Sequence, residues 1–176
     1  MVRRRTYALT ITGALAALGG AWLAVGLSPQ LEQGSVAWAS EVIDQSDVDL
    51  GWTAVDPAPG EARIMVSYRS TGLVPVSVST VLDQAMVLHS GVSVVDERDV
   101  LRPEHAAPRV TVPRGGSVAV WQTLGFPCVD LTAGSGVVAD HVLVDVTTLG
   151  ITRRLELPLL PSPVTLQTST DRSCPG

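Results

Sequence analysis

Residues 62–70 read ARIMVSYRS, and apolar and polar side chains alternate along this stretch. Ile64, Val66 and Tyr68 fall on one face of an extended chain, and the residues between them fall on the other. Because successive side chains of a strand point to opposite faces, the pattern predicts a half-buried strand of an antiparallel sheet. Residues 74–78 alternate in the same way after a Ser-Thr-Gly break. Since Pro75 cannot donate to a strand ladder, we expect that second strand to lie at a sheet edge.

Short alternating runs and turn residues continue through the rest of the chain. The predicted strands cover residues 47–55, 62–70, 74–79, 91–95, 109–112, 117–124, 142–147 and 151–157, and residues 164–166 could add a short final one. Residues 80–89 fit either a helix stripe or a strand. About seven or eight short strands, with turn signals roughly every 8–12 residues and no long amphipathic helix, predict an all-β fold: an antiparallel β-sandwich.

Two strand–turn–strand segments and the positions of the cysteines carry a family resemblance. They are VSYRSTGLVPVSV at residues 66–78, VTVPRGGSVAVW at residues 110–121, the following Cys128, and the Ser-Cys-Pro sequence around Cys174. In these features the chain resembles exported, membrane-anchored bacterial proteins with an immunoglobulin-like β-sandwich, many of them uncharacterised. The resemblance covers about two thirds of the chain and implies a fold and export, without implying a chemistry. The Cys…Trp…Cys order of antibody domains is missing, because Trp121 precedes both cysteines.

An uncharged apolar segment lies near the N-terminus. Residues 7–27 read YALTITGALAALGGAWLAVGL, and three arginines precede them at residues 3–5. A helix of this length spans roughly 31 Å, close to the hydrocarbon thickness of about 30 Å. The positive-inside rule puts residues 1–6 in the cytoplasm and residues 28–176 outside. We therefore expect a transmembrane helix or signal anchor that contacts membrane lipid through residues 7–27.

A cleaved secretory signal is the alternative to a retained anchor. The Ala-Trp-Ala sequence at residues 37–39 has the letters of a cleavage site but begins well beyond the apolar segment. Cleavage would make the protein secreted. Residues 28–46 show no clear period and are interpreted as a stalk, with Trp38 against the domain or the membrane interface. Residues 47–176 then form the extracytoplasmic domain.

The net charge argues against one class of partner, and the two cysteines predict a disulfide bond. The part of the chain beyond residue 27 contains nine arginines and 17 acidic residues, so its net charge is negative. Nucleic-acid binding is therefore not expected, because phosphate groups would be repelled. The chain has two cysteines, Cys128 and Cys174. In an oxidising compartment two isolated cysteines usually pair. We therefore predict a disulfide that ties the Pro-rich tail at residues 158–176 to the domain.

The sequence contains no convincing catalytic, cofactor or metal motif. Three histidines, His89, His105 and His141, are too widely spaced to form a motif, although Met65, Met86 and His89 could form a soft copper site. Ser135 lies between two glycines but lacks the frame of a nucleophile elbow. The acidic cluster Asp96, Glu97 and Asp99 is interleaved with arginines, as in solvated loops.

These observations favour a non-enzymatic module that binds a protein partner of unknown identity or has an accessory role in the cell envelope. The alternatives are an exported metal- or ligand-binding sensor domain and, third, a secreted hydrolase. Trp52, Trp121 and Phe126 are expected in the core or at its rim, where an exposed aromatic ring would mark an interface.

Overall fold

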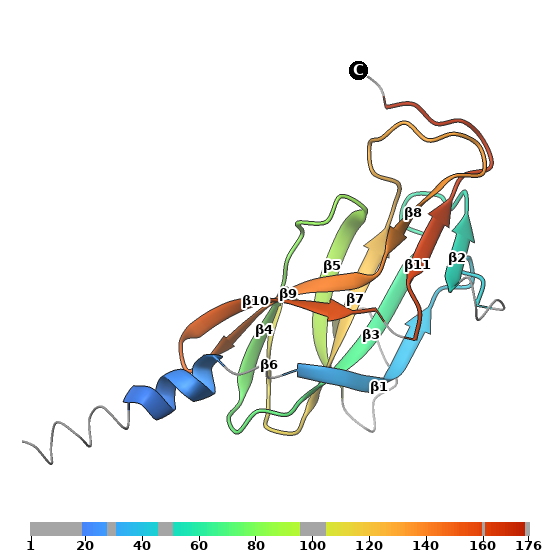
Figure 1. Cartoon of the computed structure of the whole chain (residues 1–176). Coiled ribbons are helices and arrows are strands. Elements are labelled where there is room, and N and C mark those ends of the chain that lie inside the picture. Colours follow the sequence, from blue (N-terminus) through green and yellow to red (C-terminus); the bar gives the residue numbers. More distant parts are fainter. Residues whose placement is uncertain (1–18, 28–30, 46–50, 96–104, 160, 175–176) are drawn as a thin grey trace, which may run out of the picture.

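Strands form almost all the regular structure in the computed structural model, which describes residues 19–27, 31–45, 51–95, 105–159 and 161–174 (Figure 1). Eleven strands, β1 to β11, lie within these residues. The predicted all-β character and the predominance of antiparallel pairing are confirmed. The number of strands exceeds the predicted seven or eight, because the structure adds β1 and β8 and makes residues 164–167 a full strand, β11.

The first sheet contains the strand predicted most clearly from alternation. Its four antiparallel strands follow the spatial order β1-β3-β7-β5. They are β1 (Leu31–Ala39), β3 (Arg63–Ser70), β7 (Ser117–Leu124) and β5 (Val87–Val95). Ile64, Val66 and Tyr68 of β3 are buried, as their alternation predicts, but Met65 and Ser67 on the other face are buried too, so the strand is not half-buried as expected. The ambiguous residues 80–89 divide between the end of β4, a loop over residues 81–86 and the start of β5.

The structure corrects the interpretation of residues 28–46 as a stalk. β1 lies in this range and pairs with β3 from Leu31↔Ser70 to Ala39↔Ile64. The register shifts between Gln33 and Ala37. Such a bulge interrupts the period of two, which explains why the sequence showed no strand pattern here. The folded domain therefore begins before residue 47.

The second sheet has the order β10-β9-β4-β6 and is also antiparallel. Its strands are β10 (Ile151–Pro158), β9 (His141–Thr148), β4 (Val76–Thr80) and β6 (Arg109–Val112). The prediction that the strand near Pro75 lies at an edge is wrong, because β4 pairs on one side with β6 and on the other with β9. Pro75 is tolerated because it precedes the first paired residue, Val76.

The third sheet joins distant parts of the chain in the order β2-β11-β8. Its strands are β2 (Trp52–Val55), β11 (Val164–Gln167) and β8 (Gly136–Ala139). β11 is antiparallel to β8 but parallel to β2, with Val164 opposite Trp52. The expectation of purely antiparallel pairing is corrected at this point.

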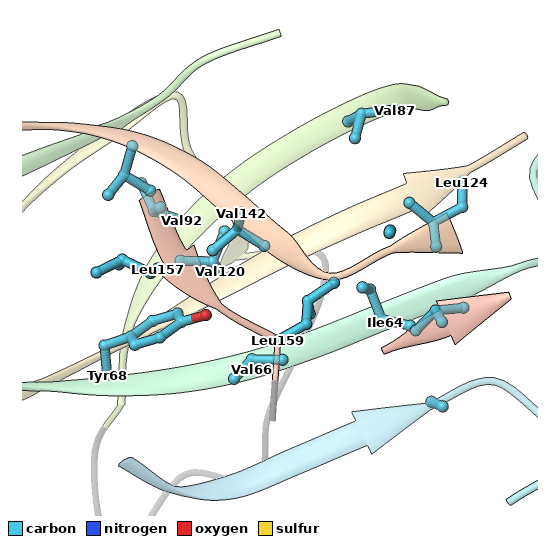
Figure 2. Packing of buried hydrophobic residues seen from close by; sticks show 14 of the residues in the cluster. Ile64, Val66, Tyr68, Val87, Val92, Val120, Leu124, Val142, Leu157 and Leu159 are labelled. Carbon is cyan, nitrogen blue, oxygen red and sulfur yellow. The ribbon is translucent and has the colours of Figure 1, made fainter. Parts of the chain in front are cut away.

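One hydrophobic core takes side chains from all three sheets. Figure 2 shows Val66 and Tyr68 of β3 facing Val142 of β9 and Leu157 of β10. Tyr68 is fully buried, and its hydroxyl donates a hydrogen bond to the carbonyl oxygen of Pro158 at 2.9 Å. This bond joins the first sheet to the second. Burial also raises the pKa of Tyr68, because a phenolate would lose its hydration there.

Residues 19–27 are helical and form the described part of the segment predicted to enter the membrane. The other part of that prediction, residues 7–18, lies outside the described residues. Across the described ranges, none of the helical structure combines the length and the apolar character needed to cross a bilayer.

The structure pairs Cys128 with Cys174, whose Cα atoms lie 5.2 Å apart. Neighbouring contacts hold the same tail. Leu131 and Arg172 form an isolated antiparallel bridge, and the Arg172 guanidinium carbon lies 4.2 Å from the Phe126 ring centroid. The tail is therefore attached to the domain by a covalent bond, a backbone bridge and a cation–π contact.

Asp56 holds the tail from the β2 side. Its carboxylate accepts hydrogen bonds from the Ser169 hydroxyl and from the Ser169 backbone N–H at 3.0 Å, and Arg172 lies 3.8 Å away. The hydrogen bond from the Ser169 hydroxyl, followed by that from the Ser169 backbone, lowers the pKa of Asp56. These bonds favour the ionised carboxylate and so couple attachment of the tail to pH.

We predict that Asp56→Asn lowers the thermal unfolding midpoint at neutral pH and has little effect in strong acid. A lowered folded pKa stabilises the protein above the unfolded pKa, near 3.8, and this contribution is lost as the pH falls through the folded value. Asn tolerates the positive φ of 45° at this position, so the turn is retained. Thermal unfolding of both proteins across the acid range is the measurement, and a midpoint difference independent of pH would contradict the prediction.

Candidate functional site

The histidines and methionines named in the sequence do not form a metal site. Met65 belongs to a small cluster on one face of the first sheet, whereas Met86 belongs to the main core on the other face. His89 and His141 line separate hollows. Among the described residues, no group of three or more His, Cys, Asp or Glu side chains converges. The first sheet thus separates Met65 from Met86, so Met65, Met86 and His89 do not converge on one copper site.

The remaining candidates for chemistry are a serine and an acidic cluster. The Ser135 hydroxyl donates to the Thr132 carbonyl oxygen at 2.6 Å within a surface turn. That bond gives Ser135 a structural role at the start of β8. The acidic cluster at residues 96–99 lies outside the described residues.

A row of register partners that includes two tryptophans crosses the outer face of the first sheet. Trp38 of β1 is the register partner of Met65, Met65 is the partner of Trp121, and Trp121 is the partner of Gly91 in β5. We call these four residues the aromatic row. The two indole rings lie 5.9 Å apart between centroids and are tilted by 55°, a favourable arrangement for aromatic pairs.

The inner part of the aromatic row is fixed and its outer part is accessible. Trp121 is 8% exposed, and its indole N–H donates to the Ser93 hydroxyl at 3.0 Å. Ala106 packs on the same cluster, and a Cβ at Gly91 would lie 2.8 Å from the Ala106 Cβ. Glycine at position 91 therefore lets the residue 106 segment cover Trp121. Trp38, by contrast, is 40% exposed.

A polar row runs beside the aromatic row. Thr123 of β7 is the register partner of both Arg63 in β3 and His89 in β5. The three residues line a hollow of about 530 Å³, together with Trp121 and the segment 106–108. Arg63 forms no ion pair with any other described residue, so its charge faces the surface next to the exposed tryptophan.

Two polar residues at the edge of the hollow have buried side-chain oxygens that are closed off from it. Ser90 and Gln122 are register partners, and Gln122 is 2% exposed. Within the described residues, Ser90 Oγ and Gln122 Oε1 are buried without a hydrogen-bond partner. The Gln122 amide nitrogen donates to Gln84 Oε1 at 3.4 Å. Both residues alternate with Trp121 and Gly91 along their strands, so their side chains point to the core face of the sheet, away from the aromatic row.

Sequence reasoning found only part of this site. It placed Trp121 in the core or at its rim, which the structure confirms, but assigned Trp38 to a stalk. The only signal for the missing strand was the alternation of Val36 and Trp38, which is too short to define a strand. Grouping Arg63, Thr123 and His89 requires the register of β3, β7 and β5, which no local pattern contains.

No protein-family model matches the chain, and no curated protein is significantly similar to it. The function is therefore inferred from the arrangement of residues on the outer face of the first sheet.

Proposed function

We propose that this chain is a non-enzymatic, single-pass membrane protein that presents a β-domain outside the cytoplasm and binds a protein partner there. The arginines at residues 3–5 and the uncharged segment 7–27 support the topology. The Cys128–Cys174 pairing is consistent with an oxidising compartment. Two four-stranded sheets that share one core support an immunoglobulin-like sandwich as the architecture of the domain.

The partner binds the outer face of the first sheet, at the aromatic row. The observation that carries this proposal is the 40% exposed Trp38, whose ring is in tilted contact with the fixed Trp121, beside Arg63, which has no ion pair within the described residues. Tryptophan and arginine are the residues most enriched among those that dominate binding energy at protein interfaces. A tryptophan whose neighbours are already fixed also loses little conformational freedom on binding.

The chemistry of the face defines the kind of partner. An apolar side chain of the partner covers Trp38, and a carboxylate pairs with Arg63. The partner is thus a protein with an acidic and apolar surface, which also complements a basic site on an otherwise acidic domain.

We predict that Trp38→Ala lowers recovery of the partner by at least about tenfold, because loss of a dominant interface tryptophan costs about 2 kcal/mol or more. The measurement is co-purification with the tagged full chain from detergent-solubilised membranes of the native host, after photo-crosslinking from a residue next to the aromatic row. Val55→Ala, on β2 of the third sheet, is the control, since Val55 is also an exposed apolar residue, at 58%.

Thermal unfolding distinguishes lost binding from lost folding. Trp38→Ala is expected to shift the unfolding midpoint only slightly, because Trp38 lies on the edge strand β1 and is half exposed. Equal recovery of the same crosslinked protein by Trp38→Ala and by the unmodified chain would refute this binding face. A small molecule held in the hollow, with no crosslinked protein, would instead favour the ligand-sensor alternative.

A further inference from the structure

The helix at residues 19–27 ends against the tip of the β9–β10 hairpin (Figure 1). Gly26 is buried, and a Cβ at this position would lie 2.6 Å from Cδ1 of Ile151. A guanidinium N–H of Arg153 donates to the carbonyl oxygen of Leu27. A cation at a helix C-terminus is favourable because the last carbonyl groups lack partners within the helix. The hairpin tip and the helix end are therefore joined by packing and by a charged hydrogen bond.

The hairpin tip exposes a leucine in an unusual backbone conformation. Leu149 and Gly150 form the two-residue link between Thr148 and Ile151, with φ angles of 51° and 82°. Such turns favour Asn, Asp or Gly, because a side chain at positive φ is strained. Leu149 is nevertheless 42% exposed. Burial in the fold does not account for a leucine at this position, whereas an apolar environment beyond the protein surface does.

Other apolar side chains are exposed at the same end of the molecule. Trp22, Leu23 and Leu27 of the helix are each between 46% and 48% exposed. The hairpin also has two arginines near this end. Arg154 is paired with Asp83 and Asp145, whereas Arg153 contacts the helix carbonyl and forms no ion pair with any described residue. Arg153 thus leaves a positive charge beside an exposed apolar surface.

We propose that the β9–β10 tip lies in the headgroup region of the outer leaflet, with Leu149 at the boundary with the acyl chains and Arg153 near lipid phosphates. This inference rests on the proposed membrane anchor, since the helix at residues 19–27 continues the apolar segment that begins at residue 7. Where that segment leaves the bilayer, its contact with Ile151 and Arg153 holds the tip at the same depth. The occupant of this surface is phospholipid.

Charge explains why the contact is confined to the tip. The part of the chain beyond residue 27 carries an excess of acidic residues, which anionic lipid repels. Arginine near the tip can approach phosphate, while the acidic surface stays in water. The contact thereby restricts the tilt of the domain, and we expect the aromatic row to be presented in a limited range of orientations.

A fluorescent probe at the tip tests the inference. The full chain, with Leu149→Cys labelled by an environment-sensitive dye, is reconstituted into phosphatidylcholine vesicles that contain some phosphatidylglycerol. The native cysteines are paired, so the label is selective. Val138→Cys on β8 is the matched control, because Val138 is 57% exposed and β8 lies at the opposite end of the domain (Figure 1). Circular dichroism confirms that both variants are folded.

The expected result is a blue-shifted emission at position 149 and severalfold stronger quenching by nitroxide-labelled lipid than at position 138. Equal, water-like emission at both positions, in protein that stays in the membrane pellet after alkaline carbonate extraction, would overturn the lipid contact and leave the anchor intact. Release of the chain into the carbonate supernatant would overturn the anchor and the inference that rests on it.

Discussion

Replacing Tyr68 by alanine is expected to lower the free energy of unfolding by about 3–5 kcal/mol, in the range for loss of a large buried aromatic side chain. Tyr68 is fully buried and lies in the core between the first and second sheets. Its removal leaves a cavity and deprives the Pro158 carbonyl of its hydrogen-bond donor. Thermal or denaturant unfolding of the chain in mild detergent, followed by near-ultraviolet circular dichroism, measures the change.

Tyr68→Phe separates the hydrogen bond from the packing. It is expected to cost about 1–3 kcal/mol, the range for leaving a buried polar group without its partner. The substitution also removes a dependence of the unfolding free energy on alkaline pH. Because burial raises the pKa of Tyr68 above its ordinary value of 10.0, its contribution is complete below that pH and is lost as the pH rises further. Near-wild-type stability of Tyr68→Ala would show that the two sheets do not depend on this side chain.

Removal of the disulfide by replacing both Cys128 and Cys174 with serine is expected to cost about 4 kcal/mol on the chain-entropy model. The two cysteines are 46 positions apart, so the bond closes a long loop in the unfolded chain. The folded tail keeps its bridge from Leu131 to Arg172 and its bonds to Asp56. The loss therefore arises mainly in the unfolded state, and the folded structure is expected to persist.

The measurement for the disulfide is the thermal midpoint of the double serine variant, compared with the oxidised and the reduced unmodified chain. The variant and the reduced chain should unfold at similar temperatures, both well below the oxidised chain. Limited proteolysis with a C-terminal tag gives a second readout, since early loss of the tag reports a detached tail. Identical midpoints for oxidised and reduced protein would show that the bond does not stabilise the domain.

Strands with unbroken alternation could be predicted from the sequence, and the irregular strand could not. β3 has buried Ile64, Val66 and Tyr68 on one face, so its period of two survives in the sequence. β1 shifts register between Gln33 and Ala37, and its apolar residues no longer share one spacing. The local pattern of β1 therefore contained too little information, although its pairing with β3 is extensive.

The pairing of distant strands is a second feature that could not be predicted from the sequence. The strand near Pro75 is internal in its sheet, because the proline lies just outside the ladder and removes no hydrogen bond from it. The partners of a strand are a property of the whole fold. By contrast, the prediction of the Cys128–Cys174 pair required only the count of two cysteines and the premise of an oxidising compartment. Prediction of the aromatic row would have required the register of four strands, which no local sequence pattern specifies.

The central place of β11 in the third sheet makes the domain dependent on its own late segment. β2 and β8 both hydrogen-bond to β11 and are not neighbours of each other. A nascent chain that stops short of residue 164 would leave both strands with open edges, which proteases and chaperones recognise. During synthesis, β2 is complete more than a hundred positions before its partner β11 begins. The fold therefore acts as a completeness check: only a chain that includes β11 can cover the edges of β2 and β8 and so shield them from degradation.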